Sequence, residues 1–126
     1  RFWKVIASIT ESEVPKTTEE KKELLLANHI AVWDVIKTCD IIGSSDSSIK
    51  NVVANDIAGL LEKTNITTVV ANGATAERLY NTYVFAQTGV RIIKMPSTSP
   101  ANAAWSLERL CKEWEKAIFF SKSDKN

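Results

Sequence analysis

Two kinds of hydrophobic pattern alternate along this chain. Segments with apolar residues three or four positions apart are typical of amphipathic helices, and short continuous apolar runs rich in β-branched residues are typical of buried strands. The patterns predict helices at residues 2–6, 17–28, 57–61, 74–87 and 103–120, and strands at 29–36, 66–71 and 90–95. Strands that alternate with helices favour a parallel sheet covered on both faces. We therefore predict a single α/β domain over residues 1–126, built as three α/β/α layers with three visible strands.

Local signals place several helix ends. Thr17 followed by Glu20 is a capping-box pattern, Asp56 with Asn55 before it is a typical N-cap pair, and Gly89 is suited to close the helix that starts after residue 73. Between the first two strands, the serine-rich segment 39–51 is long for a plain connection. Loops of that length in compact domains are often functional.

Ligands of open parallel sheets bind beyond the carboxyl ends of the strands. The predicted strands end at Trp33 and Asp34, at Asn72, and at residues 96–102. A carboxylate is costly among apolar neighbours unless it is paired or faces a cleft, so Asp34 either faces a ligand or caps the next turn. The Asn72-Gly73 pair is either a plain turn or a place where the backbone approaches a ligand at a helix start.

The third strand end reads "MPSTSPANA". One interpretation is an ordinary capped connection, with Ser99 as N-cap and Pro100 at the first helical position. The other is a phosphate-binding loop, because serine hydroxyls and the free N–H groups of a helix start attract anions. The capped connection explains only two residues of this segment.

Composition excludes few classes of function. The net charge is +1, so any surface for nucleic acid must be local, and the apolar runs are too short to span a bilayer. Cys39 and Cys111 lack metal-site spacing, and the lone His29 has no visible catalytic partner, so both cysteines are expected to be free thiols and the histidine structural. We expect a monomer without metal, cofactor or membrane contact, located in the cytoplasm, or in the nucleus in a eukaryote.

Four stretches resemble the uracil-DNA glycosylase superfamily. They are "RFWKVI" at 1–6, "IAVWDVIKTCDIIGSSDSSIKNV" at 30–52, "VVANGATAERLY" at 69–80 and "MPSTSPANA" at 95–103. The second and fourth resemble the hypoxanthine (deoxyinosine) branch in particular. The resemblance implies a monofunctional enzyme of DNA base excision repair, which hydrolyses the N-glycosidic bond of a deaminated base after that base has been flipped out of the duplex. Hypoxanthine is the expected base, with uracil a weaker alternative.

The resemblance also implies site residues. For the base pocket they are Phe2, Trp33, Asp34 and Asn72. For contact with DNA they are Ser45, Asp46, Asn51, Ser97, Thr98, Ser99, Pro100 and Asn102. The family's first strand, with its Gly-Ser-x-Pro-like end, has no match here, and the asparagine expected to be catalytic would directly precede Arg1. We therefore expect an N-terminally incomplete domain, with a degenerate protein as the alternative.

Three other functions fit parts of this pattern. A non-catalytic DNA- or phosphate-binding module would keep the serine-rich segment and do no chemistry. A mismatch-specific uracil glycosylase would share the fold with another base preference. A flavodoxin-like domain would bind a flavin or a nucleotide.

Overall fold

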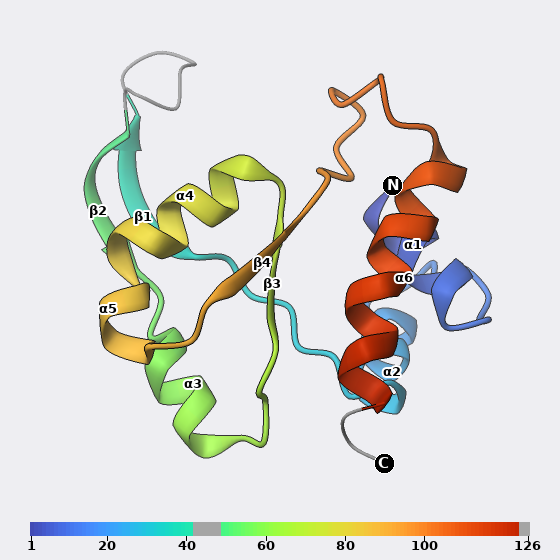
Figure 1. Ribbon diagram of the computed structural model, residues 1–126, viewed down its shortest axis with the longest axis horizontal. Coiled ribbons are helices and arrows are strands. Elements are labelled where there is room, and N and C mark those ends of the chain that lie inside the picture. Colours follow the sequence, from blue (N-terminus) through green and yellow to red (C-terminus); the bar gives the residue numbers. More distant parts are fainter. Residues whose placement is uncertain (42–48, 124–126) are drawn as a thin grey trace. The chain divides into compact units, whose positions relative to one another are not determined.

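The computed structural model describes residues 1–41 and 49–123 of the 126-residue chain. Helices and strands alternate along most of the chain, so the α/β class predicted from the sequence is confirmed. The chain forms two compact units, traced in Figure 1: the first comprises Arg1–Val32 and Met95–Asn126, and the second comprises Trp33–Lys94.

The described part of the first unit contains three helices: α1 (Phe2–Ile9), α2 (Thr18–Ala27) and α6 (Leu107–Ser123). Helices α1 and α6 lie against each other (Figure 1). The apolar positions of α1 recur at helical spacing, which places Val5 and Ile6 in the core, and α6 contributes Leu110 and Trp114 from its own apolar face. This packing fixes the position of Arg1, the residue directly before α1.

The predicted capping box begins α2. The Thr17 hydroxyl accepts a hydrogen bond from the Glu20 backbone N–H at 3.1 Å, and the Glu20 carboxylate accepts one from the Lys16 N–H, also at 3.1 Å. Both bonds satisfy N–H groups that would otherwise lack partners at or beside the helix start.

Replacing this cap should weaken the first unit. We expect Thr17→Ala to lower the free energy of unfolding by about 1 kcal/mol, because one helix-start N–H loses its acceptor. Urea denaturation followed by far-UV circular dichroism measures the loss. Thr18→Ala is the matched control, since Thr18 is exposed in the first turn; equal losses for both variants would contradict the capping role.

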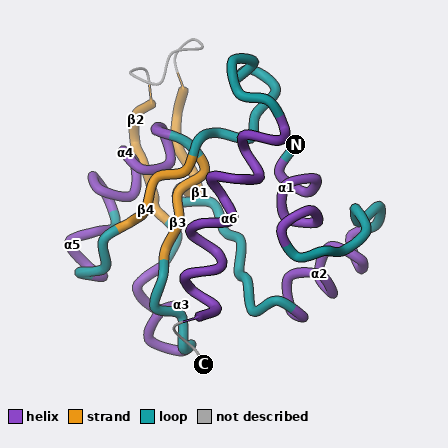
Figure 2. Tube along the Cα trace, turned by 45° about the vertical axis from the view of Figure 1, so that its right-hand side comes forward, coloured by secondary structure: helices purple, strands orange, loops and turns teal. Residues whose placement is uncertain are grey.

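The described part of the second unit, with Met95 after it, contains four strands. Strands β1 (Ile36–Ile41) and β2 (Ile49–Ala54) pair antiparallel, with Ile36 opposite Ala54 and Ile41 opposite Ile49. Strands β3 (Val69–Asn72) and β4 (Ile92–Met95) form the small parallel sheet, side by side in Figure 2. Three helices connect the strands: α3 (Ile57–Lys63), α4 (Ala74–Tyr83) and α5 (Phe85–Thr88).

Tyr80 of α4 is central to the core of the second unit. It is fully buried and packs with Ile57 and Val84. Its hydroxyl lies 2.6 Å from the Val90 carbonyl and 2.7 Å from the Thr88 hydroxyl, so the buried polar atom is satisfied. These bonds tie α4 to the segment that leads into β4.

The strand predicted at 29–36 is wrong. Residues 30–34 form no strand, and Val32 and Trp33 are half exposed. The first strand is β1, which begins at Ile36 and occupies part of the segment predicted as a loop. The reason is pairing: a strand needs a neighbour for its backbone groups, and Ile49–Ala54 supplies one close by in the sequence, at a small cost in loop closure.

Among the described residues, no helix is long and apolar enough to cross a membrane.

Candidate functional site

A single guanidinium organises residues 97–105, called the serine loop below. Arg1 Nη2 donates to the carbonyls of Ser99 at 2.8 Å and Asn102 at 2.9 Å. Its Nε donates to the Thr98 carbonyl at 3.3 Å, and its Nη1 donates to the Trp105 carbonyl at 2.5 Å. One side chain from before α1 thus gathers four carbonyls of a loop at the other end of the sequence.

Hydrogen bonds within the serine loop close it further. The Ser97 hydroxyl accepts from the Ser99 N–H and the Ser99 hydroxyl accepts from the Ala101 N–H, both at 3.2 Å. The Asn102 side-chain amide donates to the Ser97 carbonyl at 3.0 Å, and its backbone N–H donates to the Ser99 carbonyl at 2.9 Å. The loop is therefore a hydrogen-bonded unit with a defined shape.

The predicted DNA-contacting residues of this loop differ in exposure. Ser99 and Pro100 are exposed, Ser97 and Asn102 are half-buried, and the Thr98 side chain is buried with 3% of its surface exposed. The exposed and half-buried residues are available to a ligand, whereas Thr98 supports the loop from inside.

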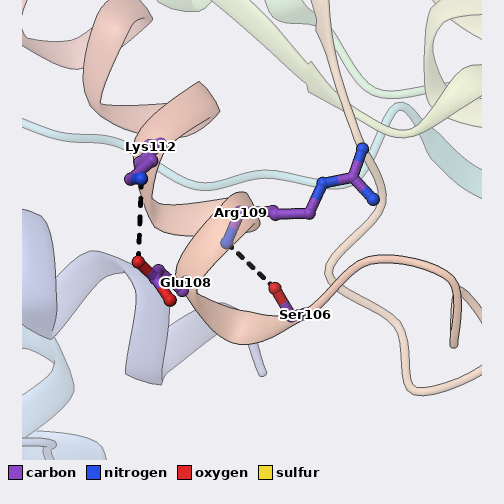
Figure 3. A network of polar contacts seen from close by, with 4 residues as sticks. All are labelled: Ser106, Glu108, Arg109 and Lys112. Atoms are coloured by element: carbon purple, nitrogen blue, oxygen red, sulfur yellow. Dashed lines mark hydrogen bonds and ion pairs between the residues drawn. The ribbon is translucent and has the colours of Figure 1, made fainter.

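The helix predicted to follow this loop directly begins later. Helix α6 starts at Leu107 rather than at 103, and the Ser106 hydroxyl caps it by accepting from the Arg109 N–H at 3.2 Å (Figure 3). Ser99 as N-cap and Pro100 as first helical residue are therefore wrong. The physical reason is competition, because Arg1 takes the carbonyls of Asn102 and Trp105 that an earlier helix start would need.

The local charge at the loop is positive. Among the described residues Arg1 has no carboxylate partner, while Glu108 in the first turn of α6 lies 3.6 Å from Lys112 (Figure 3). A second guanidinium, that of Arg109, lies 4.2 Å from the centre of the Trp105 ring and donates to the Ala104 carbonyl at 3.2 Å. Two cations thus hold the backbone of this loop.

Aromatic residues join the start of this loop to the helices. Trp114 Nε1 of α6 donates to the Pro96 carbonyl at 2.9 Å. The ring of Phe2, a predicted base-pocket residue, meets the Trp114 ring edge to face at 6.0 Å and the Trp3 ring at 5.1 Å. Phe2 is half-buried, so part of its ring remains accessible.

The predicted base-pocket residues Trp33 and Asp34 belong to the second unit, in an exposed extended segment before β1. Asp34 is therefore not at the carboxyl end of a strand, which corrects the expected position. The alternative that it caps a turn is also wrong, because its carboxylate makes no hydrogen bond or ion pair with any described residue. Only its backbone carbonyl is engaged, by the Asn55 side-chain amide at 2.7 Å.

Asn55 holds this segment at two points. Besides its side-chain bond to the Asp34 carbonyl, its backbone N–H donates to the Val35 carbonyl at 2.9 Å. Asp56 is the residue that caps α3, accepting from the Gly59 N–H at 3.0 Å. Of the two residues predicted as a cap pair, only Asp56 caps the helix with its side chain, and Asn55 instead fixes the backbone at Asp34.

Asn72 ends β3, as predicted, and is exposed. Gly73 follows with φ of 99° and is the N-cap of α4, a backbone conformation that side chains rarely adopt. The β3–α4 junction is thus a tight strand-to-helix turn.

Three predicted DNA contacts lie partly or wholly outside the described residues. Ser45 and Asp46 fall in segment 42–48, and Asn51 lies in β2, where the description does not extend to its side chain. Among the described residues, no three His, Cys, Asp or Glu side chains come together as a metal site would require.

Sequence reasoning missed Arg1 and Asn55. Arg1 stood inside the "RFWKVI" stretch without a role, and its four contacts join positions at opposite ends of the chain. Asn55 was interpreted as part of a cap, and its side-chain bond to Asp34 crosses 21 positions. Neither contact follows from a local pattern.

A scan of protein-family models and a search of curated proteins found no match to this chain. Among solved structures, the chain is similar to the solution NMR structure of a "putative Uracil DNA glycosylase" from Methanosarcina acetivorans. The two are 29% identical with a TM-score of 0.76, and the match covers 96% of this chain and 74% of the other. This chain is thus similar to that protein in fold and sequence, which supports the resemblance to the uracil-DNA glycosylase superfamily indicated by its four sequence stretches.

Proposed function

We propose that this protein is a monofunctional DNA glycosylase, which hydrolyses the N-glycosidic bond of a deaminated base flipped out of DNA. The observation that carries the proposal is the structural match over 96% of the chain to a protein described as a "putative Uracil DNA glycosylase". The resemblance of "MPSTSPANA" and of segment 30–52 to the hypoxanthine branch supports hypoxanthine as the preferred base, with uracil second.

The serine loop is our candidate for holding the DNA backbone. A flipped nucleotide must be kept out of the stack, and contacts to its phosphates stabilise that state without reading sequence. Exposed Ser99 and half-buried Ser97 offer hydroxyls, and Arg1 below them carries a charge that no described carboxylate neutralises. A fixed loop of this kind loses little conformational entropy when it binds phosphate.

Asp34 is our candidate for reading the base. An ionised carboxylate only accepts hydrogen bonds. Deamination converts the ring nitrogen N1 of adenine and N3 of cytosine from an acceptor into an N–H donor, so an acceptor-only group at this ring position distinguishes hypoxanthine from adenine and uracil from cytosine. The Asp34 carboxylate is exposed and has no partner among the described residues, as such a role requires.

Two aromatic residues and one amide are further candidates for contact with the base or with the attacking water. Phe2 and Trp33 present partly exposed rings on which a base can stack, and Asn72 presents an amide at the end of β3. Bond cleavage passes through a cation-like sugar, which nearby negative charge stabilises, and a water must attack that sugar. Neutral amides are suited to position such a water.

A base-release assay tests the proposed function. Duplexes with one inosine, one uracil or only normal bases are incubated with the 126-residue protein and with any longer natural form of it. We expect release of hypoxanthine, slower release of uracil and none from the normal duplex. Uracil released faster than hypoxanthine would instead support a mismatch-specific uracil glycosylase. Duplex binding without any base release, from every form tested, would contradict the enzyme and favour a binding module.

A further inference from the structure

We propose that Arg1 is the positioning residue of the DNA-contacting loop: it sets the shape and the charge of the serine loop from below without touching the DNA. This inference rests on the proposed function, and it assigns a part of the binding machinery to a residue that is not itself a predicted contact.

Arg1 bonds to the loop at both ends and in the middle. Its acceptors are the carbonyls of Thr98, Ser99, Asn102 and Trp105, at 2.5 to 3.3 Å. A guanidinium is planar and has five N–H donors in a fixed fork, so it can serve several carbonyls at once. No other side chain offers that combination, and a lysine ammonium has only three donors at one point.

The backbone carbonyls and the serine hydroxyls of the loop have different partners. With four carbonyls bound to Arg1, the loop directs its negative dipole ends toward the guanidinium. The hydroxyls of Ser97 and Ser99 accept backbone N–H bonds, and neither donates to a described residue. Their O–H protons therefore remain available to an outside acceptor, and a phosphate oxygen is such an acceptor.

The charge of the Arg1 guanidinium is not neutralised by any described carboxylate. Carbonyls solvate the guanidinium but do not neutralise it, and no described carboxylate pairs with it. Arg1 is half-buried, so water and salt screen its charge less than that of an exposed lysine. The loop that carries the serine hydroxyls therefore also lies over an uncompensated positive charge, which favours an anion at its surface.

Three variants separate shape from charge. Arg1→Gln removes both, and Arg1→Lys keeps the charge but not the four-carbonyl fork. Lys4→Gln is the matched control, because it removes an exposed charge from the helix that follows Arg1. Fluorescence anisotropy with a short duplex at several salt concentrations gives the dissociation constants. We expect Arg1→Gln to bind about tenfold more weakly, Arg1→Lys to lie between it and wild type, and Lys4→Gln to change affinity less than twofold.

Hydrogen exchange shows whether the loop itself loosens. In Arg1→Lys the amides of Ser99, Ala101 and Asn102 should lose protection, while the Leu110 amide in α6 keeps it. This comparison holds even if Arg1→Gln does not fold, because Arg1→Lys is the milder change. In the base-release assay the loosened loop should raise KM more than it lowers kcat, which a general loss of structure would not do.

The outcomes distinguish this inference from the function on which it rests. Wild-type protein that does not bind duplex DNA overturns both. If the wild type binds duplex DNA, three results would overturn the inference and leave the proposed function intact. These are wild-type affinity in Arg1→Gln, full affinity in Arg1→Lys, or a loss of affinity in Lys4→Gln as large as that in Arg1→Gln.

Discussion

Trp114→Ala is expected to lower the free energy of unfolding of the first unit by about 3–5 kcal/mol. The indole is 4% exposed and belongs to α6, which packs against α1. Its loss leaves a cavity, removes the edge-to-face contact with Phe2, and deprives the Pro96 carbonyl of its donor. A loss of this size is a large share of the stability of an ordinary domain.

Urea denaturation followed by far-UV circular dichroism measures this loss, with Trp114→Phe as the informative comparison. Phenylalanine keeps an aromatic ring in the core but has no N–H, so we expect a smaller loss of about 1–3 kcal/mol. Glu115→Ala changes an exposed neighbour in the same helix and should be nearly neutral. If Trp114→Ala were as stable as Glu115→Ala, the indole would not be part of the core.

The same tryptophan links stability to the candidate site. Its N–H fixes the carbonyl of Pro96, the residue directly before the serine loop. Trp114→Phe should therefore affect DNA binding in addition to stability, whereas a core change elsewhere in α6, such as Leu110→Val, should affect stability alone. Helix α6 thus fixes where the loop starts, and Arg1 fixes its interior.

Local sequence signals predicted those elements whose cause is local. The Thr17 cap, the α3 cap at Asp56 and the left-handed Gly89 after α5 are all found as predicted, since each depends on neighbours within four residues. Strand β4 also lies inside its predicted range, and β3 extends one residue beyond the predicted end at 71, because both are short β-branched runs between turn signals.

The sequence predictions failed where a residue distant in the sequence determines the local structure. Segment 30–34 is as apolar as a strand, yet it forms none, because β1 pairs instead with β2 and the apolar pattern does not encode that choice. The start of α6 was misplaced because Arg1 holds carbonyls at the far end of the chain. The hydrophobic period is a property of one segment, whereas strand pairing and long-range side-chain hydrogen bonds depend on two segments.

In the candidate site, too, local features were predictable from the sequence and long-range contacts were not. Sequence alone indicated that residues 96–102 are more than a connector, since their two prolines and three hydroxyl residues exceed what a capped turn needs, and their contact with DNA stays a prediction. It gave no indication that the loop is held by a guanidinium. For Asp34 the position was wrong, and its exposure removes the burial cost that marked this carboxylate in the sequence, so its role in reading the base stays a prediction.

Asp34→Ala is therefore expected to reduce the rate of base release about 100-fold, on the order of 2.7 kcal/mol in transition-state stabilisation. The reason is the loss of the acceptor proposed to read the N–H of a deaminated base. Stability should change by less than about 0.5 kcal/mol, because the Asp34 carboxylate contacts no described residue and the Asn55 bond goes to its backbone. Single-turnover base release and urea denaturation measure the two effects on the same preparation.

Asp56→Ala is the matched control, because it removes an acid of the same kind that has a structural role. Its carboxylate caps α3, so we expect about 1 kcal/mol of lost stability with base release nearly unchanged. Asp34→Asn should fall between wild type and Asp34→Ala and should discriminate less against adenine and cytosine, since an amide donates as well as accepts. If Asp34→Ala lost stability as Asp56→Ala does and kept its rate, Asp34 would be a structural residue, and the base would have to be read by another group.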